Sequence, residues 1–170
     1  MMTASETIFQ NLYNLLSQTQ LLSGGVPSGG PVFVNPTATG RRTPQRDAVS
    51  PALLPGLWVT QGDQMVVENA IALPKYEMKA WVLVMCEVTE GQNAIASTQL
   101  NNLRDAVLYQ LQQQTLAGDG TTVIPLLGGQ KQTLGGVVYH ARVKGTIVFL
   151  EGLQNNRSAL VFPVSILSGH

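Results

Sequence analysis

The side chains that could support catalysis are few and separated in this sequence. Aspartates and glutamates occur singly, and there is no D-x-D, H-E-x-x-H or G-x-S-x-G pattern, the spacings typical of metal-dependent and nucleophilic enzymes. His140 has no serine or cysteine beside it. Alternation places it with Arg142 and Lys144 on the polar face of a predicted strand, where a solvated or hydrogen-bonded imidazole is expected. We therefore expect no catalytic site and a protein that is not an enzyme.

The cysteine and glycine patterns do not indicate a cofactor. The one cysteine, Cys86, lies in the apolar run WVLVMCEV. This position predicts a buried structural thiol, and a single cysteine excludes an internal disulfide framework or a Cys-based zinc site. The glycine pairs at residues 128–129 and 135–136 do not have the G-x-x-x-x-G-K-[ST] spacing of a phosphate-binding loop. We expect no bound cofactor and no metal ion.

The composition favours a single domain, residues 1–170, that associates with other proteins. Charged residues make up 12% of the chain and the formal net charge is zero, whereas about 25% charged residues is usual. A neutral chain is not suited to capture DNA or an anionic membrane electrostatically, and a charge-poor surface favours association. The sequence contains no apolar run of membrane-spanning length and no signal-peptide pattern at its start, so we expect an intracellular origin and no membrane partner.

Two amphipathic segments predict helices. Residues 97–116 carry apolar side chains at helical spacing on one face, and Gly118 follows as the expected stop. The members of this stripe are Leu100, Leu103, Val107 and Leu111, widened by Ala106 and Leu108. Residues 3–22 predict a first helix, which Thr3 and Glu6 would begin with a capping box.

Apolar runs bounded by glycine and proline predict the strands. They cover residues 31–36, 52–60, 65–73, 76–89, 137–150 and 159–167, with a turn at 62–64. The breaks at Pro55 and Gly56 and at Pro163 indicate edge or bulge positions, because proline cannot donate to a strand ladder. Strands come in runs rather than alternating with helices. The fold class predicted is therefore α+β, a mainly antiparallel sheet with two helices packed on it.

The polar segment 37–50, TATGRRTPQRDAVS, has no hydrophobic period and predicts an extended loop or arm. Loops of this length are usually either functional or disordered, and both readings stay open. The arm and the two tryptophans supply the candidate interface residues; Trp81 suits either a core position or an interface anchor. The candidate set is Arg41, Arg42, Arg46, Asp47, Trp58 and Trp81.

The order of these motifs resembles that of bacteriophage tail terminators, the tail-completion proteins of long-tailed phages. The likeness covers most of the chain. It comprises an N-terminal helix, PVFVNP, a Pro-Ala-Leu box at 51–53, the strand from Trp81, the LNNLRDAV helix at 100–107, an L-G-G segment at 127–129, and a final V-x-G-x-I strand and hairpin. The Gly-rich spacer at 23–30 and the second Gly-Gly pair depart from the family pattern.

The resemblance implies a virion protein. Family members form a six-fold ring that caps the finished tail tube and joins the tail to the head-side connector. It therefore implies a homohexamer whose partners are the tail tube and connector proteins, with DNA at most passing through the lumen. The arginines of the arm would contact a neighbouring protein rather than the DNA. Two alternatives stay open: another neck or head-completion protein of similar fold, and a nucleic-acid-binding module resting on the arginine loop.

Overall fold

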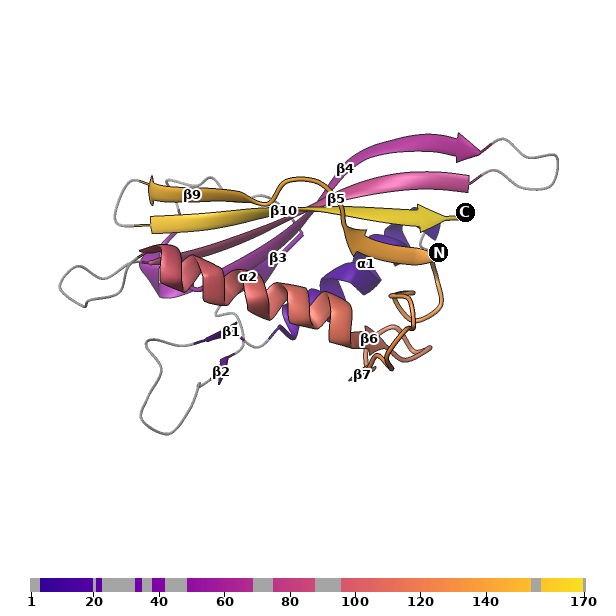
Figure 1. Ribbon diagram of the computed structural model, residues 1–170, viewed down its shortest axis with the longest axis horizontal. Coiled ribbons are helices and arrows are strands. Elements are labelled where there is room, and N and C mark those ends of the chain that lie inside the picture. The colour runs from indigo at the N-terminus through magenta and orange to yellow at the C-terminus, as the bar shows by residue number, and fades with distance from the viewer. Residues whose placement is uncertain are drawn as a thin grey trace.

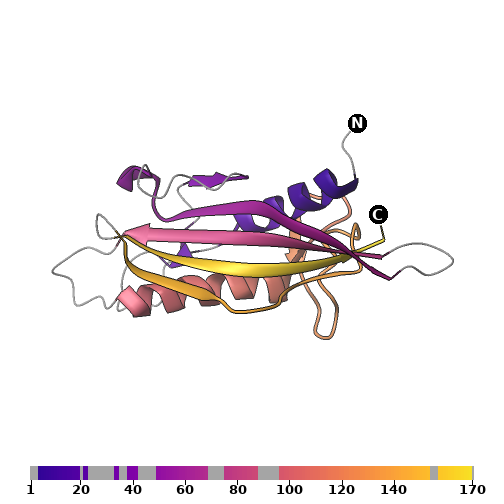
Figure 2. The ribbon, with the colours of Figure 1, turned by 90° about the horizontal axis from the view of Figure 1, so that it is seen from above.

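The computed structural model describes residues 4–19, 21–22, 33–34, 38–41, 49–68, 75–87, 96–153 and 157–169. Two helices, α1 (Ala4–Ser17) and α2 (Ala96–Gln113), lie on one side of a mostly antiparallel sheet (Figures 1 and 2). The predicted α+β class is confirmed. The strands are β1 (Leu21–Leu22), β2 (Phe33–Val34), β3 (Ala38–Gly40), β4 (Gly56–Glu68), β5 (Lys75–Glu87), β6 (Gln114–Leu116), β7 (Val123–Pro125), β8 (His140–Val143), β9 (Val148–Leu153) and β10 (Arg157–Ser168).

The main sheet is built around two long strands, β5 and β10. Its order is β3-β4-β5-β10-β8, and β9 also pairs with β10; β3 runs parallel to β4, and the other neighbours are antiparallel. β5 and β10 pair without interruption from Glu87↔Arg157 to Tyr76↔Ser168. The pairs β1–β2 and β6–β7 form two small separate sheets.

The helices cover the inner face of the main sheet. Alternate residues of β5 point toward them, and the predicted stripe of α2 is buried against this face. This layer holds Met78, Ala80, Val82, Val84 and Cys86 of β5 with Leu100, Leu103, Ala106, Val107 and Leu111 of α2. Burial raises the pKa of the Cys86 thiol to about 11, so the prediction of a buried structural cysteine is confirmed.

Both helices end earlier than predicted. The helix predicted at 3–22 ends at Ser17, and Leu21–Leu22 forms β1 instead. The helix predicted at 97–116 ends at Gln113, because the chain turns there into β6 and pairs with β7. Gly118 is therefore part of the β6–β7 connection and not a helix stop. Thr3, the predicted cap, lies outside the described residues.

The turn predicted at 62–64 is wrong. β4 runs from Gly56 to Glu68 as one strand, and the register against β5 shifts between Gln61 and Gln64. This bulge absorbs the Gly-Asp-Gln sequence within the ladder. The start of β4 pairs with both β3 and β5, so it is not an edge, and Pro51–Leu53 forms a short 3-10 helix before it.

The long strand predicted at 137–150 is two strands, and this explains Pro163. β8 ends at Val143 and β9 begins at Val148, so β10 lacks a partner strand between them on that side. Pro163 lies at this gap, where its carbonyl accepts a hydrogen bond of 3.0 Å from the N–H of Lys144. Proline has no N–H to donate, but no hydrogen bond is lost here, because no strand carbonyl on that side faces Pro163. The sequence predicts an edge or a bulge position for Pro163. The edge strand is wrong, because β10 is central; the irregularity at Pro163 is the interruption between β8 and β9.

Candidate interaction surfaces of the sheet

The outer face of the sheet carries no α-helix in the described part of the chain (Figure 2). Strand register divides it into two halves. Near the start of β4 it is apolar, where Trp58, Leu83, Met85 and Ala159 form a second buried cluster with Val49. At the other end, toward β8, charged and polar side chains share the outward positions with Met65, Pro163 and Leu167. Trp81 lies between the two halves.

Each tryptophan lies against a glycine of β4. A methyl group added at Gly56 would come within 2.2 Å of the Trp58 indole, and one at Gly62 within 3.0 Å of the Trp81 ring nitrogen. The two side chains differ in their cover. Trp58 is 7% exposed under the neighbouring apolar residues, whereas Trp81 is 42% exposed. Of the two predicted candidates, Trp81 is the one that offers surface to a partner.

Arg41 makes its contacts within the subunit. Its guanidinium pairs with Glu6 at 2.5 Å, donates to the side-chain oxygen of Gln10 at 3.3 Å and lies 6.0 Å from the centre of the Phe9 ring. These contacts fasten the chain just after β3 to the first turns of α1. The remaining arm candidates, Arg42, Arg46 and Asp47, lie outside the described residues.

The charged half of the outer face is organised around one carboxylate. Glu77 of β5 accepts hydrogen bonds from the Lys144 ammonium at 2.8 Å and from the Ser165 hydroxyl at 2.6 Å. These two bonds, the first above all, lower the pKa of Glu77. The contact links β5 to the β8–β9 connection across β10, because Ser165 lies on β10 and Lys144 follows β8.

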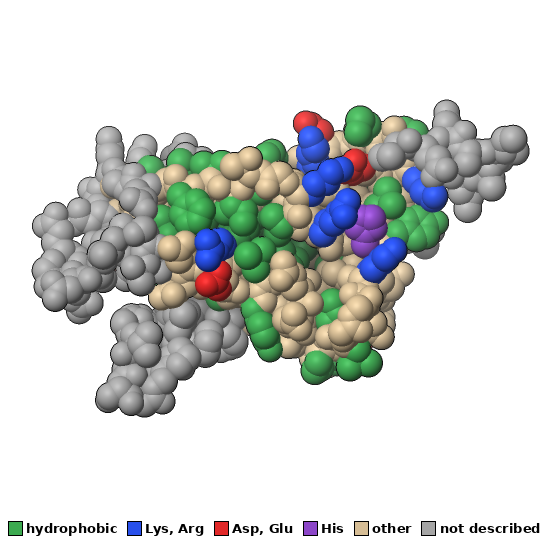
Figure 3. Space-filling model, viewed as in Figure 1, with side chains coloured by type: hydrophobic (Ala, Val, Ile, Leu, Met, Phe, Trp, Pro, Cys, Tyr) green, Lys and Arg blue, Asp and Glu red, His purple; other side chains and the backbone are tan. Residues whose placement is uncertain are grey.

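His140 lies among cations at the edge of this half. Desolvation lowers its pKa from the ordinary value, and the neighbouring charges of Arg142, Lys131 and Lys144 lower it further against an opposing effect of Glu77. The imidazole is thus uncharged at neutral pH. Figure 3 shows Lys and Arg side chains gathered around this histidine near β8. The predicted sharing of one strand face by His140 and Arg142 is confirmed by their pairing with Leu167 and Ser165.

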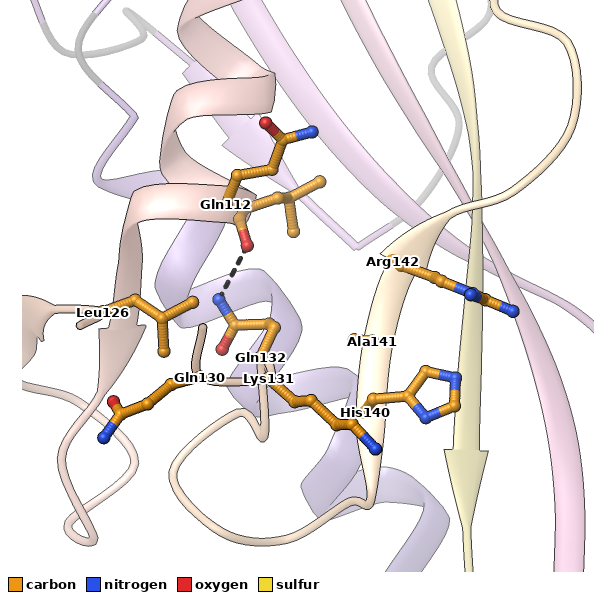
Figure 4. Close-up of a pocket in the computed structure, with 9 residues that line it drawn as sticks. Gln112, Leu126, Gln130, Lys131, Gln132, His140, Ala141 and Arg142 are labelled. Carbon is orange, nitrogen blue, oxygen red and sulfur yellow. Dashed lines mark hydrogen bonds between the residues drawn. The ribbon is translucent and has the colours of Figure 1, made fainter. Parts of the chain in front are cut away.

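A cleft of about 330 Å³ lies between the end of α2, residues 130–132 and β8. In Figure 4, Gln132 and Leu126 face the cleft, whereas His140 and Arg142 extend to the other side of β8. The Gln132 amide donates to the Leu111 carbonyl at 3.0 Å and is held by further bonds to Gln114, Thr115 and Leu134. The hydrogen bonds of the Gln132 amide are thus used in holding the fold together. Lys131, His140 and Arg142 also contribute to the lining of the cleft.

The outer edge of the sheet exposes apolar side chains. Among the described strands, β9 pairs with β10 alone, so its second edge is open. Val148 on the outer face and Phe149 on the inner face are 41% and 40% exposed. Open apolar edges favour pairing with another chain. The alternating pattern of the sequence did not predict this edge. The edge can be recognised only once residues 140–153 are known to form two strands, β8 and β9, instead of one.

Neither a metal cluster nor a membrane-spanning helix occurs in the part of the chain that the structure describes. No group of three or more His, Cys, Asp or Glu side chains is placed to hold a metal ion there. Its helices are not long and apolar enough to cross a membrane. No protein-family model matches the chain, and no curated protein matches it.

Proposed function

We propose that this protein is a structural subunit of a phage virion, a tail terminator that assembles into a ring, caps the completed tail tube and joins the tail to the head-side connector. The observation that carries the proposal is the open edge of β9, with Val148 and Phe149 exposed on its two faces. The order of motifs along the whole chain supplies the family resemblance. The low proportion of charged residues in the chain suits burial of a large surface between copies.

The two ends of the sheet suggest how copies would join. β3 lies at one end of the strand order and β9 flanks the other. Pairing the β9 edge of one copy with the β3 end of the next would be a head-to-tail contact, which closes into a ring when the rotation between copies fits. Backbone hydrogen bonds would hold such a contact without charged side chains.

The β9 edge is tested by Phe149→Lys. A lysine there adds charge to an edge that would otherwise enter a dry interface. Leu127→Lys is the matched control, because Leu127 is 67% exposed in the turn after β7 and is not part of β9. By light scattering over a dilution series, we expect wild type and Leu127→Lys to form hexamers and Phe149→Lys to form monomers with an unchanged circular dichroism spectrum. Equal masses for the two variants would contradict the assignment of β9.

The virion role is tested in the phage that encodes the chain. We expect deletion of the gene to leave tails that are not joined to heads, and complementation to succeed with Leu127→Lys but fail with Phe149→Lys. A gold-labelled copy should lie at the tail side of the head–tail junction in electron micrographs. A label on the capsid side would assign the protein to head completion instead, and normal virions without the gene would refute the proposal.

A further inference from the structure

The outer face of the sheet carries a concentrated positive charge beside Trp81. We define the basic face as Lys79, Lys131, His140, Arg142 and Lys144, with Glu77 among them. Lys79 and Glu77 point outward from β5, and Arg142 and His140 point outward from β8. Lys144 directly follows β8, and Lys131 lies beside β8 in the lining of the cleft. Figure 4 shows Lys131 extending toward His140.

We propose that the basic face and Trp81 together dock an acidic segment of a different protein, with an apolar side chain of that segment seated on the indole. This inference goes beyond ring formation and does not depend on the β9 edge.

The cationic side chains of the basic face favour an acidic partner. The basic face holds four cationic side chains and Glu77, whose carboxylate is engaged by Lys144 and Ser165. A second carboxylate, Asp63, is in the β4 bulge opposite Lys79. In the described structure the side chains of Lys79, Lys131 and Arg142 form no ion pair with a carboxylate. A chain of zero net charge that gathers cations on one exposed face carries an electrostatic complement for a negative partner.

The exposed ring of Trp81 offers a surface for an apolar side chain of the partner. Trp81 rests on the bulge of β4, where Gly62 leaves room for the ring, and its cross-strand neighbour on β10 is Pro163. An exposed, laterally supported indole loses little conformational freedom on binding. Tryptophan and arginine are the side chains most often found at the energetic centre of protein interfaces.

The occupant that fits best is an acidic protein segment. Nucleic acid would require more phosphate contacts than three free cations provide, and the charged half offers one supported aromatic ring for stacking. A second copy is a poorer complement, because the acidic side chains described here form no cluster: Asp63 is on β4, Glu87 is at the far end of β5, and Asp119 is in the β6–β7 connection.

The test is a fluorescence titration with a defined probe, the peptide acetyl-(Glu-Leu-Glu-Glu)₃-amide. Because Trp58 is buried and Trp81 is exposed, quenching or a spectral shift reports on Trp81. We expect saturable binding that weakens at least tenfold between 50 and 300 mM salt, since the screening length shortens from about 14 Å to about 6 Å over this range. The same peptide with lysine in place of glutamate and a twelve-residue oligothymidylate should bind at least tenfold more weakly.

The matched variants are Arg142→Glu and Arg104→Glu. Both replace a surface arginine by glutamate, but Arg104 lies on α2 beside Asp105, away from the basic face. We expect Arg142→Glu to weaken peptide binding at least fivefold and Arg104→Glu to change it less than twofold, both with wild-type circular dichroism. Equal loss in the two variants, no saturable response, or tighter binding of the oligonucleotide than of the acidic peptide would each overturn the proposal.

Discussion

Replacing Gln132 by leucine should destabilise the protein more than its similar size suggests. Gln132 is 4% exposed and makes four hydrogen bonds. Its amide donates to the carbonyls of Leu111 and Gln114 at the end of α2. Its carbonyl accepts from the Thr115 hydroxyl at 2.7 Å and from the Leu134 N–H at 3.1 Å. Leucine fills similar space but leaves all four partners without this bond, three of them buried and the Gln114 carbonyl partly buried.

The expected loss follows from those four groups. A buried polar group that loses its partner costs about 1 kcal/mol or more. The Thr115 hydroxyl can rotate, and leucine gains about 1 kcal/mol from the additional apolar burial. The net loss in free energy of unfolding is therefore about 3 kcal/mol. For a protein of this size, with an m-value of about 2 kcal/mol/M in urea, the unfolding midpoint falls by about 1.5 M.

The assay is urea unfolding followed by circular dichroism, repeated at several protein concentrations because association would itself add stability. Gln112→Leu is the matched control, since Gln112 is exposed on α2 beside the same cleft. Its midpoint should change by no more than about 0.25 M. A urea midpoint for Gln132→Leu within about 0.25 M of the Gln112→Leu midpoint would show that the hydrogen bonds of Gln132 do not stabilise the end of α2.

Three further predictions concern single positions. Gly120→Ala should lower stability by about 2 kcal/mol in the same urea assay, because φ is +70° and the new methyl would lie 2.8 Å from the Asn11 side chain; Gly128→Ala, with open space around it, should change little. Cys86, with its pKa raised to about 11 by burial, should react with Ellman's reagent at pH 8 only after unfolding; immediate reaction of the native protein would contradict its burial. The Thr122 hydroxyl above all, and the N–H groups of Thr122 and Thr121, lower the pKa of Asp119 to about 2. Because this folded pKa is depressed, the Asp119 contribution to stability is present above about pH 4 and is lost as the pH falls through about 2. The amide resonances of Thr121 and Thr122 should titrate in that range in wild type but not in Asp119→Asn.

The elements predicted best from the sequence are those in which the spacing of apolar residues along the chain shows which face is buried. The apolar stripe of α2 is buried except for Leu108, which is partly buried. β5 passes from a solvated start to burial on both faces, as its pattern indicates. In both cases the side chains repeat at the spacing of the element they form. The fold class followed from the order of these elements.

Element ends and breaks depended on distant partners and could not be predicted from local pattern. The sequence VVYHARVKGTIVFL alternates as one strand would, yet the ladder with β10 is interrupted between Val143 and Val148. Gly145 at this break has a φ of +122°, and a methyl there would lie 3.1 Å from the Pro163 ring. A glycine in one segment and a proline in another thus fit each other across the sheet, and neither alone reveals the gap.

The outer face shows how one local arrangement yields two different surfaces. Trp58 and Trp81 sit on neighbouring strands, and each lies against a glycine of β4. Val49 and the partly buried Leu54 pack around Trp58, so that ring completes a buried cluster. At Trp81 the adjoining outward positions include Lys79, Thr60 and Pro163, and the ring stays exposed. The sequence around each tryptophan is similarly apolar, so burial could not be assigned from the residues alone. The difference comes from the segment just before β4, whose Val49 and Leu54 cover Trp58 but not Trp81. Trp81 and the adjoining basic face therefore remain exposed, and we expect a partner to bind there.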